Sequence, residues 1–196
     1  MYCLQVPSGA VSLGERVAQP GLLSARALTC VYEGPPPRQR PPGVEKVPKR
    51  LGIVGYPLRH TLSPIFQQAA LDHYALAARY EVWETPPEAL EVRLKELRAP
   101  EVLGFNITLP PKERACSLVD QVEGPAAQAG ALNTVVNQEG RLIAYNTDVE
   151  GLLEALRREG GFDPRGKRVL LLGAGGSARA AVVALARAGA ASLVIA

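Results

Sequence analysis

The chain has 196 residues, of which 47% are hydrophobic and 21% are charged, so it can bury the core of one domain and part of a second. Its 22 basic and 19 acidic residues leave a formal net charge of +3 and are interleaved along the sequence, which argues against nucleic acid as a partner. The apolar runs are too short to cross a bilayer, and the N-terminal residues lack the pattern of a secretory signal, so we expect no membrane partner.

The cysteines indicate the redox environment. Cys3, Cys30 and Cys116 are widely separated and form no C-x-x-C pair. This spacing argues against a disulfide framework and against a zinc site, and we expect no bound metal. We therefore expect a cytoplasmic protein, because the cytoplasm keeps thiols reduced.

The first 50 residues have little amphipathic period. The segment GPPPRQRPPG at Gly34–Gly43 cannot form a helix or a central strand, because its prolines lack backbone N–H donors. We expect residues 1–50 to be a disordered extension or linker, and folded structure to begin near Arg50.

After Arg50, short apolar segments alternate with helical patterns. The first helix is predicted to have Ser63 as its N-cap and Pro64 at its first position. The next helix opens with prolines. In chain order the predicted elements are a strand at Leu51–Gly55, a helix at Pro64–Leu76, a strand at Arg79–Thr85, a helix at Pro86–Leu97 and a strand at Val102–Thr108.

The next part of the chain continues the alternation. A helix is predicted from about Lys112, and the sequence from Ala131 to Asp148 reads as two strands around a turn at Gln138–Gly140. Leu152, Leu153 and Leu156 share one face of a helix that bridges two domains. Strands separated by helices of this length predict an α/β fold with a mostly parallel sheet.

A strand, a glycine loop and an alanine-rich helix follow at Lys167–Ala188. Gly173, Gly175 and Ala178 have the G-x-G-x-x-A spacing of a dinucleotide-binding loop, in which backbone N–H groups approach a pyrophosphate at the helix N-terminus. The sequence ends at Ala196, before the position where a residue that binds the adenosine ribose is expected. We therefore expect a C-terminally truncated chain, with a substrate-binding and catalytic domain at 51–149 and the first part of a Rossmann domain at 150–196.

Polar clusters stand at strand ends or helix starts, where ligands bind in open α/β sheets. They are HTLSP (60–64), GFNITLPPK (104–112), GALNT (130–134) and YNTDVEG (145–151). The hydroxyls of Thr61 and Ser63 at a helix N-terminus suit an anion such as a carboxylate. Lys112, held by two prolines at a strand end, suits proton transfer. Taken singly, Ser63 and Asp148 are more easily explained as helix caps and Lys112 as a surface lysine, but the ordered set favours a functional site.

These ordered motifs resemble the shikimate dehydrogenase family. Members show H-S-x-S-P, N-V-T-x-P-x-K, G-A-V-N-T, N-T-D-x-x-G and G-A-G-G-x-x in this order, and the likeness extends from Leu51 to Ala196. The resemblance implies NADPH-dependent reduction of 3-dehydroshikimate to shikimate, a step of aromatic amino acid biosynthesis. It also implies a small-molecule substrate and a monomer or homodimer.

The resemblance assigns roles to individual residues. Lys112 and Asp148 match the catalytic pair, Thr61 and Ser63 match groups that hold the substrate carboxylate, and Thr108 and Asn133 match groups that bind ring hydroxyls. Asn106 is expected to support the backbone. The residues expected to surround the NADP pyrophosphate are Gly173, Ala174, Gly175, Gly176 and Ser177.

Two departures leave alternatives open. Thr61 stands where the family usually has serine, which bears on the choice between shikimate and quinate. The family segments that read the NADP phosphate and complete the nicotinamide pocket would follow Ala196. A quinate/shikimate dehydrogenase that uses NAD or NADP, and a non-catalytic sugar-acid-binding module, therefore remain alternatives, and the 196-residue chain alone is expected to be inactive.

Overall fold

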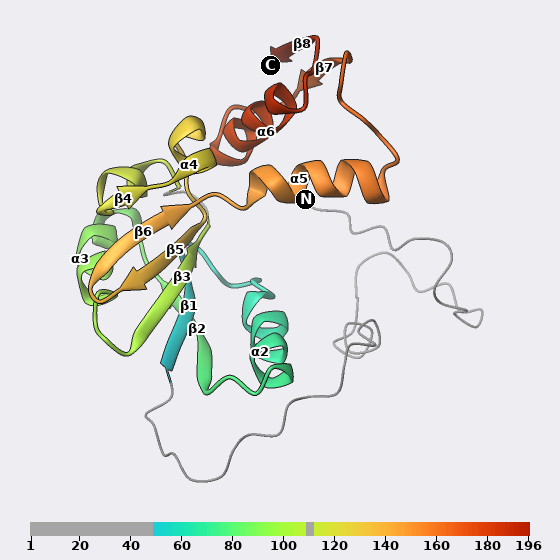
Figure 1. Cartoon of the computed structure of the whole chain (residues 1–196). Helices are drawn as coiled ribbons and strands as arrows, with labels where there is room; N and C mark the ends of the chain where they lie inside the picture. Colours follow the sequence, from blue (N-terminus) through green and yellow to red (C-terminus); the bar gives the residue numbers. More distant parts are fainter. Residues whose placement is uncertain (1–48, 109–111) are drawn as a thin grey trace.

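The computed structural model describes residues 49–108 and 112–196, and its larger part is built on a six-stranded sheet. The extension expected over residues 1–50 lies outside the described residues except for Lys49 and Arg50, with which the first strand begins. The strand order is β2-β1-β3-β5-β6-β4 (Figure 1). The strands are β1 (Lys49–Gly55), β2 (Ala78–Glu84), β3 (Val102–Ile107), β4 (Gln121–Val122), β5 (Thr134–Gln138) and β6 (Arg141–Tyr145).

The sheet is mostly parallel, as predicted. β1 is parallel to both β2 and β3, and β4 is parallel to β6. β5 is antiparallel to β3, and it is also antiparallel to β6 because these two strands form the predicted hairpin. Glu139 and Gly140 have φ values of 54° and 90° in its turn, and Gly140 adopts such a φ without steric cost.

One face of the sheet carries the main core. The helical segments η1 (Pro87–Ala89), α3 (Leu90–Glu96), η2 (Arg114–Ser117) and α4 (Gly124–Ala129) cover this face. Buried residues from the helices and strands meet in one cluster, and their removal from water is the main stabilising contribution. The cluster includes Val54, Trp83, Leu90, Leu94, Phe105, Ile107, Leu132 and Leu142.

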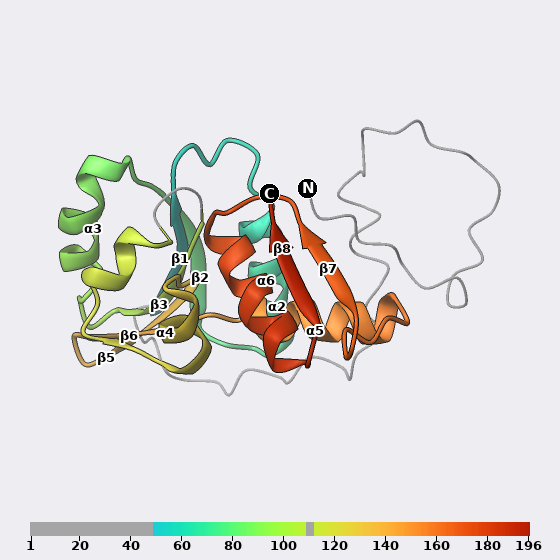
Figure 2. The ribbon, with the colours of Figure 1, turned by 90° about the horizontal axis from the view of Figure 1, so that it is seen from above.

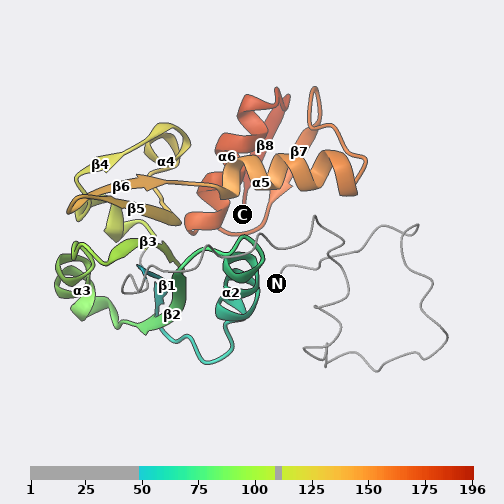
Figure 3. The same ribbon diagram turned by 60° about the horizontal axis from the view of Figure 1, so that its bottom comes forward.

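The opposite face is covered by α2 (Ser63–His73), as Figure 3 shows. This helix has no residue classed as buried, and its Leu71 packs against a small cluster of Ile53, Leu58 and Tyr80. The Gln68 side chain of α2 lies against the edge strand β2. Its Oε1 accepts a hydrogen bond from the Tyr80 backbone N–H at 2.9 Å, and its Nε2 donates to the Ala78 carbonyl at 3.4 Å.

The C-terminal part packs on the end of the sheet from which α5 emerges. It comprises α5 (Asp148–Glu154), a π-helical turn η3 (Ala155–Glu159), β7 (Arg168–Leu171), α6 (Gly176–Arg187) and β8 (Ser192–Ile195), with β7 parallel to β8 (Figure 2). Leu152 and Leu153 of α5 pack against α6. In the described part of the chain, no helix combines the length and the apolar character needed to cross a membrane.

Polar contacts also join α6 to the larger part. Arg179 Nε lies 3.2 Å from a carboxylate oxygen of Glu113, and Arg187 Nε donates to Gln128 Oε1 at 3.0 Å. The Arg179 contact, together with the packing of α5, holds the first turns of α6 close to the chain that follows β3, and the Arg187 contact holds the end of α6 close to α4.

Two local predictions were wrong. Helix α2 begins at Ser63 with Leu62 as N-cap, because the Leu62 carbonyl accepts the first helical hydrogen bonds, and it ends at His73, before Ala75 with φ 51°. The helix predicted from Lys112 is only the 3-10 turn η2. Helix α5 begins at Asp148 with Thr147 as its N-cap, so the alternative explanation of Asp148 as a helix cap does not apply.

Candidate functional site

Five of the segments singled out in the sequence contribute to one cavity of about 610 Å³. It lies at the end of β3, between the start of α2, the segment before β5 and the starts of α5 and α6. Because each contributing segment begins or ends a strand or helix here, side chains far apart in the sequence converge. The lining residues are Ser63, Phe66, Gln67, Asn106, Ile107, Thr108, Lys112, Asn133, Asp148 and Ser177.

Lys112 and Asp148 form an ion pair in this cavity. Lys112 Nζ donates to Asp148 Oδ2 at 2.6 Å, and the side chains are 13% and 27% exposed. The Lys112 main chain is also fixed, since its carbonyl accepts a hydrogen bond from Leu132 N–H at 3.1 Å. An ammonium on a largely buried side chain, held at one point, can deliver or withdraw a proton at a defined position.

Asn133 holds the other oxygen of the same carboxylate. Asn133 Nδ2 donates to Asp148 Oδ1 at 2.7 Å and to Thr147 Oγ1 at 3.0 Å, while Asn133 Oδ1 accepts from Thr147 N–H at 3.0 Å. Both carboxylate oxygens of Asp148 therefore accept hydrogen bonds, which fixes the plane of the carboxylate.

Asn106 lies behind Asn133. Its Nδ2 donates to the Asn133 carbonyl at 3.3 Å and to Thr134 Oγ1 at 3.2 Å, and its Oδ1 accepts from Tyr80 Oη at 2.7 Å. Tyr80 is 8% exposed, and burial raises the pKa of its phenol to about 12.

Sequence reasoning overlooked several residues of this site. Phe66 and Gln67 line the cavity, and Tyr80, Thr134 and Thr147 belong to the hydrogen-bond network behind it. Phe66 and Gln67 lie one turn after Ser63 on α2, so helical spacing from that residue could have indicated them. Tyr80 belongs to a strand with no polar cluster at its end, and only the tertiary structure reveals its contact.

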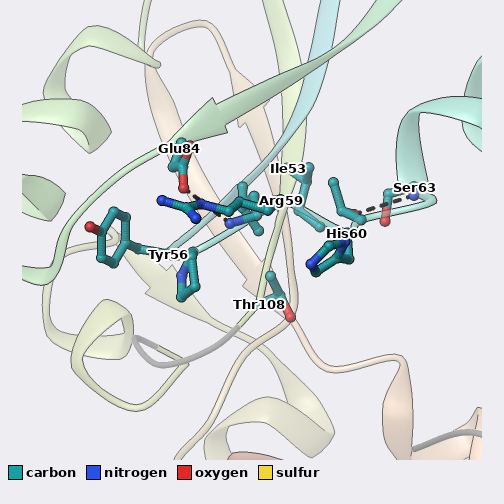
Figure 4. Close-up of a pocket in the computed structure, with 10 residues that line it drawn as sticks. Ile53, Tyr56, Arg59, His60, Ser63, Glu84 and Thr108 are labelled. Atoms are coloured by element: carbon teal, nitrogen blue, oxygen red, sulfur yellow. Dashed lines mark hydrogen bonds between the residues drawn. The ribbon is translucent and has the colours of Figure 1, made fainter.

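Thr61 lines a neighbouring cavity of about 550 Å³, which Ser63 and Thr108 share with the first (Figure 4). Its Oγ1 accepts a hydrogen bond from Ser63 N–H at 3.3 Å. Thr61 is therefore adjacent to the Lys112 cavity rather than inside it. Arg59 and Glu84 also line this second cavity.

The glycine loop connects β7 to α6. Gly173 has φ 115°, which favours glycine strongly, and a Cβ at Gly173 or Gly175 would meet no atom within 4 Å. No side chain caps the N-terminus of α6. An open loop at an uncapped helix N-terminus fits the phosphates of a dinucleotide.

The loop also touches the ion pair. A Cβ added at Gly176 would lie 3.1 Å from Lys112 Cβ and 3.2 Å from Lys112 Cδ, and Ser177 lines the Lys112 cavity. Gly173, Ala174 and Gly175 are exposed beside it. Over residues 49–108 and 112–196, no group of three or more His, Cys, Asp or Glu side chains is arranged to hold a metal ion. These features define an α/β protein in which a polar cavity adjoins a dinucleotide-type loop.

A family model described as the shikimate dehydrogenase substrate binding domain matches residues 53–135. The shikimate dehydrogenase (NADP(+)) of Geobacter metallireducens is 46% identical over 146 residues, which cover 74% of this chain and 51% of the relative. The enzyme of that name from Thermus thermophilus is 47% identical over 140 residues, covering 71% and 52%. Residues 53–135 thus match the shikimate dehydrogenase substrate binding domain, and the chain is similar to shikimate dehydrogenases over about half of their length.

Solved structures agree with this assignment. The structure of shikimate 5-dehydrogenase from Thermus thermophilus in complex with NADP(H) and shikimate matches with a TM-score of 0.69 and 44% identity, over 75% of this chain and 56% of that one. The ligand-free 5-ketofructose reductase of a Gluconobacter species matches with a TM-score of 0.67 and 37% identity, over 75% and 52%. The chain spans about half the length of the curated relatives it matches.

Proposed function

We propose that this chain carries the substrate-binding and catalytic residues of an NADP-dependent shikimate dehydrogenase, which interconverts 3-dehydroshikimate and shikimate. The observation that carries the proposal is the Lys112–Asp148 ion pair at 2.6 Å, in a cavity that Ser177 of the glycine loop also lines. The similarity to shikimate dehydrogenases that use NADP(+), and the match of residues 53–135, support this choice of substrate and cofactor.

The ion pair suits the proton transfer that this reaction needs. When the ketone is reduced, its oxygen gains negative charge and must receive a proton, and the Lys112 ammonium can stabilise that charge and donate the proton. Asp148 accepts a hydrogen bond from Lys112 and keeps the ammonium oriented. In the reverse direction, Lys112 would withdraw the proton from the hydroxyl.

The remaining polar residues suit the rest of the substrate. Ser63 and Thr108 lie where the two cavities meet, and Thr61 lies beside them, so their hydroxyls can hold the carboxylate and a ring hydroxyl. Asn133 presents its amide next to Asp148 and can contact a second ring hydroxyl. NADPH would supply the hydride, and its pyrophosphate would bind to the backbone of Gly173, Ala174, Gly175, Gly176 and Ser177.

The proposal also covers the division of the chain into domains, the location of the protein and its oligomeric state. We expect the chain to divide near residue 150 into a substrate domain and a dinucleotide-binding part. The protein would act in the cytoplasm as a monomer or homodimer, a location that suits the free thiol of Cys116.

Titration of the purified 196-residue chain with shikimate in a calorimeter tests the proposal, with quinate and 5-ketofructose as competing candidates. We expect shikimate to bind, and binding to weaken about tenfold or more when Asp148→Asn disrupts the charged pair. Absence of shikimate binding, or equal binding to the Asp148→Asn variant, would contradict the proposal. NADPH absorbance in the presence of shikimate and NADP⁺ measures turnover in parallel and tests the expectation that the chain alone is inactive.

A further inference from the structure

A continuous row of hydrogen bonds leads from the middle of β2 toward the cavity. Tyr80 Oη donates to Asn106 Oδ1 at 2.7 Å, and Asn106 Nδ2 donates to Thr134 Oγ1 at 3.2 Å. Thr134 Oγ1 then donates to Asn133 Oδ1 at 3.0 Å. These side chains come from β2, β3 and β5 and the residue before β5, so the row crosses the sheet.

The row ends at the ion pair. Asn133 Nδ2 donates to Asp148 Oδ1 at 2.7 Å, and Asp148 Oδ2 accepts from Lys112 Nζ at 2.6 Å. From the phenol to the carboxylate every donor therefore points in the same direction. Asp148 therefore accepts one hydrogen bond from Asn133, the last donor of the row, and one from Lys112.

The direction of the hydrogen bonds in the row is fixed by neighbouring backbone groups, each of which can only donate or only accept. The Asn133 carbonyl can only accept, so the Asn106 group that faces it at 3.3 Å must be the Nδ2 donor. Thr147 N–H can only donate, so the Asn133 group that faces it at 3.0 Å must be the Oδ1 acceptor. The other end of the Asn106 amide, Oδ1, then accepts from Tyr80, and the other end of the Asn133 amide, Nδ2, donates to Asp148.

Tyr80 is well placed to anchor the row. Its ring packs with Ile53 and Leu58, and its backbone N–H donates to Gln68 Oε1 at 2.9 Å. Because burial raises the pKa of the phenol to about 12, the hydroxyl keeps its proton at physiological pH and remains a donor.

We infer that Tyr80 is a positioning residue for the ion pair, although it does not itself line the cavity. Its hydroxyl holds Asn106, and through Thr134 and Asn133 it fixes the orientation of the Asp148 carboxylate. The role of the oriented Asp148 carboxylate in binding shikimate rests on the proposed function, whereas the orientation of the carboxylate by Tyr80 does not. The row of hydrogen bonds belongs to the protein itself.

The variant Tyr80→Phe removes the donor and retains the ring. Its first readout is the NMR signal of the Asn133 side-chain amide, compared between Tyr80→Phe and wild type without any ligand. We expect this signal to shift, and we expect the dissociation constant for shikimate to rise about threefold or more. Asn106→Ala, which breaks the row one step later, should shift the same signal.

Thr85→Val is the matched control. Thr85 follows β2, is 2% exposed, and donates to the Trp83 carbonyl at 2.8 Å, so the variant removes a buried hydroxyl outside the row. It should lower the thermal midpoint without changing the Asn133 signal or the shikimate affinity.

A double-mutant cycle separates positioning from general destabilisation. In the Asn106→Ala background, Tyr80→Phe should cause no further loss of shikimate affinity, since the row is already broken. An unmoved Asn133 signal in Tyr80→Phe, or fully additive losses, would overturn the inference. If the wild-type chain failed to bind shikimate, the proposed function would fall, and the Asn133 signal would still decide the role of Tyr80.

Discussion

Lys112 is restrained at both its main chain and its ammonium. The carbonyl accepts from Leu132 N–H, the ammonium donates to Asp148, and the aliphatic stem lies against Gly176. A lysine normally loses considerable rotamer entropy when it is fixed, of the order of 2 kcal/mol. Here the surrounding contacts impose that order before any ligand arrives, which is the arrangement expected of a proton-transfer group.

Lys112→Ala should therefore weaken shikimate binding by about tenfold or more, because the ligand loses a charged hydrogen-bond donor. Titration calorimetry of the chain measures the effect. Lys95→Ala is the control, since Lys95 also pairs with a carboxylate, that of Glu91 at 2.8 Å, but on the outer surface of α3. Equal losses of shikimate affinity in the two variants would contradict a direct role of Lys112 in binding.

Ser63 and Thr61 should differ in their contribution to binding, although both were assigned to the carboxylate. Ser63 lines both cavities, whereas Thr61 lines only the neighbouring one and already accepts a hydrogen bond from Ser63 N–H. We expect Ser63→Ala to raise the dissociation constant for shikimate about fivefold or more, and Thr61→Ser to change it less than twofold. Competition measured by NMR would contradict this if Thr61→Ser had the larger effect.

The sequence predicted which polar residues line the site better than it predicted the contacts that these residues make. Asn133, Lys112 and Asp148 could be identified because each follows or precedes an apolar strand at a motif position. That Asp148 binds Lys112 instead of capping α5 depends on a tertiary contact across 36 residues of chain, which local patterns do not encode. The contact of Tyr80 with Asn106 could not be predicted for the same reason.

At the scale of elements, strands and hairpins were predicted more accurately than short helices. β2 lies within one residue of its predicted position, and the β5–β6 hairpin has its turn where predicted and ends within three residues of the predicted bounds, because alternation and turn residues mark them. The segment after Lys112 has a helical composition, yet it forms only a 3-10 turn. The Lys112 carbonyl accepts from Leu132 N–H, a tertiary contact that the segment itself does not reveal, and Cys116 N–H donates to the Glu113 carbonyl with the spacing of a 3-10 turn.

The start of α6 supports a further prediction. Gly176→Ala should weaken shikimate binding about threefold or more, because its new Cβ would press on the Lys112 stem at 3.1 Å and 3.2 Å. Calorimetric titration and urea unfolding of the same samples measure affinity and stability together.

Gly151→Ala in α5 is the matched control for Gly176→Ala. A Cβ at Gly151 would meet no atom within 4 Å, so alanine should stabilise the helix by up to about 1 kcal/mol and leave binding unchanged. If both variants behaved alike, the contact between the glycine loop and Lys112 would have no energetic consequence.

For the whole molecule, stability should fall in acid through Glu81. Its carboxylate accepts from Arg50 Nη2 at 2.7 Å and from Trp83 Nε1 at 2.9 Å, and the hydrogen bond from Arg50 lowers the pKa of Glu81 below its usual range. A lowered folded-state pKa contributes stability above the unfolded value of about 4.3, and this contribution is lost as the pH falls through the folded value.

We therefore expect Glu81→Gln to be less stable than wild type at neutral pH, and to lose less stability between about pH 5 and pH 3. Urea unfolding followed by Trp83 fluorescence across that range measures both effects. Glu159→Gln serves as the control, because Glu159 lies on the exposed end of η3. A Glu81→Gln profile parallel to that of wild type would show that the pair does not contribute to acid stability.

The hydrogen bonds of Gln68 to the edge strand β2 affect whether copies of this protein can pair through their sheet edges. An edge strand offers unpaired peptide groups on which a foreign strand can grow, and this is a common start of aggregation. On β2 the outward N–H of Tyr80 and the outward carbonyl of Ala78 are already occupied by the Gln68 amide, a single side chain that imitates one peptide unit of a neighbouring strand. At this position the edge of the sheet offers a foreign strand no free peptide group, because a side chain from the helix on the face of the sheet already occupies both partners.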